Sequence, residues 1–260
     1  MKLLREILYK VEINSVVGNT SLSINKIEFD SRLISDGDMY VAITGVNVDG
    51  HSFISQAIQN GANCIVCEKI PDNKTDGVVY VNVKSSRKAL AIISSNYFDN
   101  PSSKLNLIGV TGTNGKTTIA TLLFDLYTVL EIKSGLISTV KISYDNKNFQ
   151  ANQTTPDSLS INRFLSEMVN SNVRYCFMEV SSHGIDQNRT DGLIFKGGIF
   201  TNLTHDHLDY HESFENYRDT KKRFFDSLSN NSFALTNNDD KNGMFMLQNT
   251  IADKYTYSLN

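Results

Sequence analysis

A glycine-rich segment of the sequence carries the residue types that bind nucleotide phosphates. Residues 109–118 read GVTGTNGKTT, between a short apolar run and a stretch with helical periodicity. Glycines let successive backbone N–H groups point at phosphate oxygens, and a helix N-terminus adds positive potential. Lys116 is expected to hold the β- and γ-phosphates of ATP, and the Thr117 hydroxyl to bind Mg²⁺. Because Val110 stands where the strict G-x-x-x-x-G-K-[ST] pattern needs its first glycine, a turn without a ligand is the alternative.

A carboxylate and a hydroxyl follow a second apolar run, in the segment 178–183 (MEVSSH). Parallel sheets place their binding sites at the carboxyl ends of their strands, so Glu179 and Ser181 are expected to face the phosphate loop. A carboxylate there is a natural ligand for Mg²⁺, which is a hard cation. The alternative is a glutamate that only caps a helix.

Histidines and aspartates alternate in the segment 204–211 (THDHLDYH). The pattern His205-x-His207-x-Asp209 is similar to the H-x-H-x-D-H motif of metallo-β-lactamase-type hydrolases, which bind two zinc ions. Tyr210 stands where that motif needs its third histidine, and a zinc hydrolase would leave the phosphate loop without a purpose. A solvated polar loop is the other alternative.

The elements that must position these residues form two patterns. Residues 1–83 alternate short apolar runs with turn signals and predict a small α/β domain with strands near 27–29, 39–43, 64–66 and 78–81. Residues 53–58 predict a helix that ends at Asn60-Gly61. Residues 84–103 predict a connecting helix, Ser85–Tyr97, and a linker.

From residue 104 to 260 the sequence alternates apolar strands with helices. Strands are predicted near 105–110, 175–180, 198–203 and 233–236, with a further alternating segment at 254–257. Ile119, Leu122, Leu123 and Leu126 recur at helical spacing after the phosphate loop. This order favours an α/β fold: a P-loop ATPase-type domain with a mostly parallel sheet, incomplete at its C-terminal end.

Composition narrows the class of protein. The 260 residues are 40% hydrophobic and 20% charged, with a net charge of −3, which is typical of a globular protein and argues against broad binding to nucleic acid or membranes. No apolar run approaches a membrane span, and no signal sequence is present, so a cytoplasmic protein is expected. A monomer is the default. Cys64 and Cys67 lie in an apolar stretch, so buried structural cysteines are favoured over a redox or zinc site.

The motifs together resemble the Mur ligase family, whose members join amino acids to UDP-linked muramyl peptides. The resemblance covers nearly the whole chain and is greatest to the members that add the third peptide residue. The segments that carry it are 29–32 (FDSR), 45–51 (GVNVDGH), 109–118, 154–157 (TTPD), 178–183 with Gln187 and Arg189, 200–211, and 216–221 (NYRDTK). The related folylpolyglutamate synthetases are disfavoured, because they begin directly with their ATPase domain and lack a segment like Asp30-Ser31-Arg32.

The resemblance also implies roles for individual residues. The small N-terminal domain would bind the UDP moiety through Ser31 and Asn47, and the muramyl peptide would be held by Thr154, Thr155, Ser181, Gln187 and Arg189. ATP would be bound by Gly112, Thr113, Asn114, Gly115, Lys116, Thr117 and Thr118. Thr117 and Glu179 would bind one Mg²⁺, and His207 a second, together with Lys221 as a carbamate (N6-carboxylysine). Lys116, Glu179, His207 and Lys221 would form the catalytic group.

The activity implied by the resemblance is ATP-dependent amide-bond formation through an acyl phosphate. The acceptor would be UDP-N-acetylmuramoyl-L-alanyl-D-glutamate, and the incoming diamino acid meso-diaminopimelate, the commoner substrate in the family, or L-lysine. Family members also carry a C-terminal domain that this sequence lacks, so we expect the 260 residues to bind ligands in part and to turn over poorly. A fragment that binds nucleotide or muramyl peptide without catalysis is the alternative.

Overall fold

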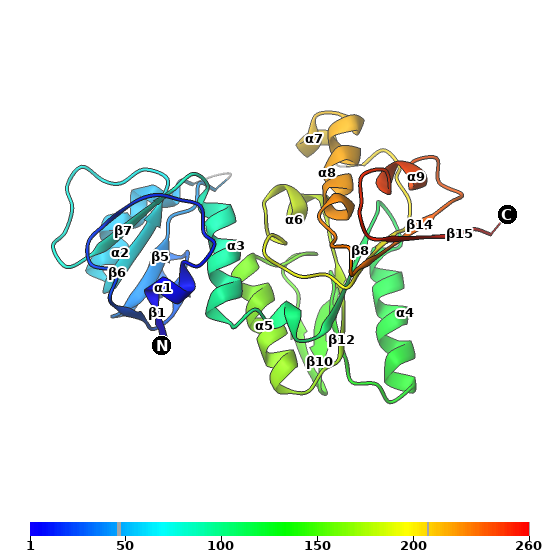
Figure 1. The fold of residues 1–260 in the computed structure, drawn as a ribbon, viewed down its shortest axis with the longest axis horizontal. Coiled ribbons are helices and arrows are strands. Elements are labelled where there is room, and N and C mark those ends of the chain that lie inside the picture. The colour runs from blue at the N-terminus through cyan, green and yellow to red at the C-terminus, as the bar shows by residue number, and fades with distance from the viewer. Residues whose placement is uncertain (46–47, 207, 260) are drawn as a thin grey trace. The chain divides into compact units, whose positions relative to one another are not determined.

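The chain divides into two units in the computed structural model, which describes residues 1–45, 48–206 and 208–259. The units are Met1–Asp99 and Asn100–Asn260 (Figure 1). Each has a hydrophobic core of its own. None of the helices in the described ranges combines the length and the apolar character that crossing a bilayer requires.

The first unit is built on a five-stranded sheet with the order β2-β7-β6-β5-β4 in its described residues. The strands β4 to β7 run parallel, and β2 pairs antiparallel with β7 at one edge. The elements are β1 (Lys2–Leu3), α1 (Leu4–Ile7), β2 (Ile13–Val17), β3 (Ser23–Ile24), β4 (Ile27–Glu28), η1 (Ser31–Leu33), β5 (Asp38–Val41), η2 (Gly50–Phe53), α2 (Ile54–Gln59), β6 (Ala62–Cys67), β7 (Val79–Val83) and α3 (Ser86–Tyr97). The strands and helices predicted from residues 27–97 are therefore confirmed.

Cys64 and Cys67 lie on the central strand β6, three residues apart, so their side chains point to opposite faces of the sheet. Both are fully buried and free, and burial raises the pKa of both thiols, that of Cys67 to about 11. The prediction of buried structural cysteines is confirmed, because neither thiol is exposed or ionised at neutral pH.

The second unit is built on an eight-stranded sheet, counted over its described residues, with the order β11-β10-β9-β12-β8-β13-β14-β15. In that order, the strands β9, β12, β8, β13, β14 and β15 are parallel to their neighbours. The hairpin β10–β11 adds an antiparallel edge beside β9. The elements are η3 (Pro101–Ser103), β8 (Asn106–Thr111), α4 (Lys116–Val129), β9 (Ser134–Ile137), β10 (Lys141–Tyr144), β11 (Lys147–Gln150), α5 (Ser158–Asn170), β12 (Tyr175–Glu179), α6 (Ser182–Asp186), β13 (Gly197–Phe200), α7 (Leu208–His211), α8 (Phe214–Asp226), β14 (Phe233–Asn237), α9 (Gly243–Met246) and β15 (Asp253–Tyr257). The mostly parallel sheet predicted from the sequence is confirmed.

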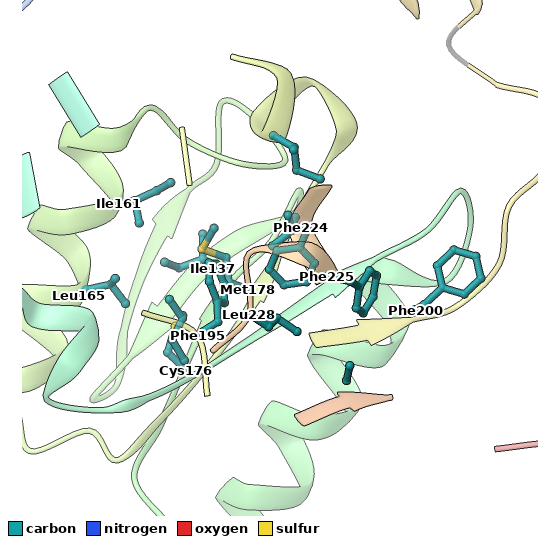
Figure 2. Close-up of a cluster of buried hydrophobic side chains, with 14 of the residues drawn as sticks. Ile137, Ile161, Leu165, Cys176, Met178, Phe195, Phe200, Phe224, Phe225 and Leu228 are labelled. Atoms are coloured by element: carbon teal, nitrogen blue, oxygen red, sulfur yellow. The ribbon is translucent and has the colours of Figure 1, made fainter. Parts of the chain in front are cut away.

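Helices cover both faces of this sheet, because alternate strand residues point to opposite sides. Ile108 and Val110 of β8 pack toward α4, while Leu107 packs with α5 and α8 on the other face. Figure 2 shows part of this second core, in which Met178 of β12 lies among apolar side chains that include Ile161 and Phe224. The two layers fix the carboxyl ends of β8, β12 and β13 at one edge of the sheet.

Side-chain caps start the helices α5, α6 and α8. Asp157 accepts a hydrogen bond from Ser160 N at the start of α5, Ser181 from Gly184 N at α6, and Ser213 from Asn216 N at α8. Such caps satisfy N–H groups that an α-helix leaves without internal partners. The polar residues of the strand ends are therefore held in short, fixed segments.

Candidate active site

The phosphate loop connects β8 to α4 through two residues with positive φ. Gly112 has a φ of +149° and Gly115, the N-cap of α4, a φ of +85°, a region that favours glycine. Among the described residues no side chain caps α4, and the N–H groups of Lys116, Thr117 and Thr118 in its first turn have no acceptor within the helix. This is the local geometry that binds a phosphate at a helix N-terminus.

The segment after β13 holds the phosphate loop from one side. Asn202 accepts hydrogen bonds from Thr113 N (2.8 Å, to its carbonyl) and Asn114 N (3.0 Å, to its side chain), and Thr201 Oγ1 donates to Asn114 O (2.7 Å). A Cβ at Gly112 would lie only 2.0 Å from Thr201 Oγ1, so the close approach requires a glycine at that position. The loop is therefore shaped before any ligand arrives.

Two lysines converge on one backbone oxygen of this loop. Lys116 Nζ donates to Gly112 O (3.0 Å) and Thr113 O (2.8 Å), and Lys221 Nζ donates to the same Gly112 O (2.9 Å). Burial lowers the pKa of Lys116, although the carboxylates of Glu179 and Asp206 oppose part of the change. Burial, and then the charge of Lys116, lowers the pKa of Lys221 well below its ordinary value. Lys221 is thus the member of the pair that gives up its proton more easily.

The helix α8 presents two adjacent lysines, and only one of them faces the loop. The side chain of Lys221 is 1% exposed, and its Nζ lies 4.6 Å from the centre of the Tyr217 ring. Lys222 instead forms an ion pair with Asp226, one turn along the same helix, at 2.7 Å. Since consecutive helix residues are about 100° apart, the phase of α8 separates the two side chains.

Glu179, the last residue of β12, is fully buried. Thr139 N donates to its Oε1 (2.8 Å) and Thr139 Oγ1 to its Oε2 (3.1 Å). The backbone oxygen of Glu179 accepts a hydrogen bond from the Thr155 hydroxyl (2.8 Å). Both ends of this glutamate are therefore fixed by hydroxyl-bearing residues from other segments.

The residues expected to hold the muramyl peptide meet beside Glu179. The Thr155 hydroxyl, itself fully buried, accepts from Ser181 N (2.9 Å). Arg189 donates to Thr155 O (2.6 Å), to Gln153 Oε1 (2.6 Å) and to Gln187 Oε1 (2.7 Å). These contacts hold the guanidinium of Arg189 at the end of β12.

A pocket of about 300 Å³ joins the two lysines at the phosphate loop to the residues expected to hold the muramyl peptide. It lies entirely in the second unit and is lined by Lys116, Gln153, Thr154, Thr155, Ser181, Ser182, His183, Arg189 and Lys221. Three of these side chains are basic, and none of the described lining residues is acidic, so the pocket suits an anionic ligand. The pocket brings together Lys116, Lys221, Thr154, Thr155, Ser181 and Arg189 from the sequence prediction.

Other predicted residues lie elsewhere or outside the described residues. Glu179 is not among the described lining residues of the pocket, and Gln187 bridges Arg189 and the Tyr210 hydroxyl (3.3 Å). In the first unit, Ser31 is 5% exposed and donates to Gln56 Oε1 (3.0 Å). Asn47 and His207 lie outside the described residues.

Sequence reasoning missed several residues that the fold brings to this site. His183 was part of a recognised segment without a role, yet it lines the pocket, and its ring lies 4.1 Å from the Tyr210 ring. Thr139 carries no motif at all. Tyr217 contacts Thr113 through its hydroxyl (3.2 Å), and its spacing of four residues from Lys221 on α8 could have indicated that both face the loop.

Residues 110–260 match the Mur ligase middle domain, and residues 23–98 match the Mur ligase family, catalytic domain. The chain belongs to the Mur ligase family. The middle-domain match, over residues 110–260, includes the segment with His205 and Asp209. The phosphate loop and the histidine segment therefore belong to one Mur ligase domain, and the zinc-hydrolase alternative gains no support.

Two curated relatives of this Mur ligase chain have the same name. It is 52% identical over 257 residues to the UDP-N-acetylmuramoyl-L-alanyl-D-glutamate--2,6-diaminopimelate ligase of Cytophaga hutchinsonii and 43% identical over 258 residues to that of Clostridium tetani. Each alignment covers 98% of this chain and 53% of the relative. A solved structure of a ligase with the same name is similar, with a TM-score of 0.82 at 25% identity, over 100% of this chain and 53% of that one. The chain thus spans about half the length of the curated relatives it matches.

Proposed function

We propose that the whole protein is an ATP-dependent amide-bond ligase of peptidoglycan precursor synthesis, acting in the cytoplasm as a monomer. Its acceptor is UDP-N-acetylmuramoyl-L-alanyl-D-glutamate, and its incoming amine is meso-diaminopimelate. The names of the relatives support diaminopimelate over L-lysine. The observation that carries the proposal is the shared pocket, in which the phosphate-loop lysine and the residues expected to hold the muramyl peptide line one space.

Phosphoryl transfer from ATP to the D-glutamyl carboxylate requires both anions in that space. Lys116 already donates to two carbonyl oxygens of the loop. Phosphate oxygens are stronger acceptors than carbonyls, so the ammonium exchanges those bonds for the β- and γ-phosphates. The guanidinium of Arg189, held by Gln153 and Gln187, orients the acceptor.

The reaction then proceeds through substrate-borne species. A carboxylate oxygen bonds to the γ-phosphorus as the bond to ADP breaks, giving an acyl phosphate. The amine of the incoming residue attacks the acyl carbon, the bond to phosphate breaks, and the nitrogen loses a proton. The chain contributes position and charge, and no serine or cysteine nucleophile is needed.

The donor groups of the chain fit Mg²⁺. Glu179 offers a carboxylate with acceptor capacity beyond its two hydrogen bonds from Thr139, and Thr117 offers a hydroxyl on the first turn of α4. Mg²⁺ is usually held by one or two protein groups together with substrate phosphates and water, and this is such a set. When bound, the ion neutralises phosphate oxygens as charge moves toward the leaving group.

Lys221 has the surroundings that a lysine carbamate needs. Carbamate formation joins a neutral amine to CO₂ and releases a proton, so it requires an amine that is unprotonated near neutral pH. Burial and the charge of Lys116 lower the pKa of Lys221 in that direction. The carbamate replaces a cation with an oxygen ligand, which we propose binds a second Mg²⁺ with His207.

Calorimetric titration with UDP-N-acetylmuramoyl-L-alanyl-D-glutamate, with Mg²⁺ and a non-hydrolysable ATP analogue present, tests the proposal. We expect binding that weakens on Arg189→Ala, by about 10-fold or more for the loss of hydrogen bonds to a charged group. Arg174→Ala, which changes an exposed arginine outside the pocket, is the matched control. Binding of the nucleotide without the muramyl peptide would overturn the substrate assignment and leave the family assignment intact.

A further inference from the structure

Thr139, which belongs to none of the sequence motifs, contacts both oxygens of the buried Glu179 carboxylate. Both hydrogen bonds described to this carboxylate come from Thr139, one to each oxygen, at 2.8 and 3.1 Å. A pair of bonds from one residue to both oxygens fixes the plane of the carboxylate as well as its position. Thr139 itself is exposed, in the short connection between β9 and β10.

A second hydroxyl continues this contact into the pocket. Thr139 Oγ1 lies 3.1 Å from Thr154 Oγ1, and Thr154 lines the pocket. A hydroxyl has one proton to donate. Thr139 Oγ1 is in donating position to both Thr154 Oγ1 and Glu179 Oε2, so its proton serves one of these acceptors at a time. The Thr139 hydroxyl therefore lies between Thr154 and Glu179.

The segment that contains Thr154 and Thr155 also contacts the backbone of Glu179. The Thr155 hydroxyl donates to the carbonyl of Glu179 and accepts from Ser181 N. Residues 154 and 155 thus reach Glu179 by two routes, through Thr139 to its carboxylate and directly to its main chain. The loop expected to hold the muramyl peptide and the carboxylate expected to hold Mg²⁺ are linked by hydrogen bonds.

We propose that Thr139 is a positioning residue for Glu179, and that it fixes which carboxylate lone pairs are presented to Mg²⁺ and links them to Thr154. The inference rests on the proposed function, since it concerns the metal that accompanies ATP. Carboxylates that ligate metals are held by hydrogen bonds from neighbouring groups, whose loss costs about 10–100-fold in metal affinity. Valine at position 139 keeps the backbone N–H and removes only the hydroxyl, so the lower end of that range applies.

The experiment measures how much Mg²⁺ strengthens nucleotide binding. The dissociation constant of a non-hydrolysable ATP analogue is determined by calorimetry on the whole protein, with and without Mg²⁺. The value without Mg²⁺ is divided by the value with Mg²⁺, so that a larger ratio means a larger effect of the ion. We expect Thr139→Val to reduce this ratio about 10-fold while the affinity without Mg²⁺ stays unchanged. Thr139→Ser, which keeps both donors, restores the native ratio.

Two outcomes separate this inference from the proposed function. A native ratio in Thr139→Val would overturn the role of Thr139 and leave the ligase assignment standing. A native protein that binds no nucleotide in either condition would overturn the proposed function, and the inference with it. Thermal unfolding of each variant checks the fold, and Thr139→Ala, which also lacks the hydroxyl, replaces the valine variant if that one unfolds.

Discussion

The buried hydroxyl of Thr155 provides the sharpest test of how the pocket is held together. It donates to Glu179 O at 2.8 Å and accepts from Ser181 N at 2.9 Å, and the side chain is fully buried. Thr155→Val keeps the shape but leaves both partners without this bond. A buried polar group left unpaired costs about 1–3 kcal/mol, so we expect a loss of about 2–6 kcal/mol for the two together.

Thr155→Ser is the matched control, since it keeps the hydroxyl and removes one methyl group. That methyl packs against Gly184, where a Cβ would come within 2.8 Å of Thr155 Cγ2, so its loss should cost about 1 kcal/mol. The assay is urea unfolding followed by circular dichroism, with midpoints compared at a common slope. A valine variant as stable as the serine variant would refute the hydrogen-bond argument, because packing alone would then account for the site.

Three further predictions concern the phosphate loop, α8 and β6. In ¹³C NMR with ¹³C-bicarbonate, we expect a carbamate resonance that Lys221→Arg abolishes and Lys222→Arg retains. The resonance should fade as the pH falls, because the Lys221 amine, whose pKa is lowered, then becomes protonated. A resonance that persists in Lys221→Arg would contradict this prediction. Gly112→Ala should abolish binding of an ATP analogue. A Cβ at Gly115 would meet only Thr201 Cβ, at 4.0 Å, so Gly115→Ala should cost only about 1 kcal/mol of backbone strain. Equal effects of the two substitutions, measured by calorimetry and urea unfolding, would contradict the steric argument. Cys67, with its pKa raised to about 11, should react with a thiol reagent only on unfolding, and labelling of the native protein by mass spectrometry would contradict its burial.

The parts of the site that are local in sequence were predictable from it. The phosphate loop is one example, because glycines, a lysine and a following helix lie within ten residues and their geometry follows from backbone rules. The hairpin β10–β11 could have been predicted by the same reasoning. Asp145 and Asn146 both have positive φ, as the tightest hairpin turns require, and such residues favour that turn.

The parts that depend on tertiary packing were not predictable. Leu122 and Leu126 share the helical spacing of Ile119 and Leu123, yet they are 58% and 51% exposed, because α4 contacts the sheet along only one side. Periodicity indicates a helix but cannot tell how wide a stripe its neighbours cover. Thr139 reaches Glu179 across 40 positions of sequence only because β9 is hydrogen-bonded beside β12.

The convergence of Lys116 and Lys221 follows from strand order. β13 lies next to β8, and α8 follows β13 in the chain, so α8 can bring Lys221 to the loop that ends β8. Each amine then donates to the same neutral carbonyl, that of Gly112. Two amines that can carry positive charge repel each other there, and a polyphosphate or a carbamate on Lys221 would remove the repulsion by adding negative charge. The fold therefore holds two basic groups in an arrangement that an anion stabilises, and this explains why a ligand with several negative oxygens suits the pocket.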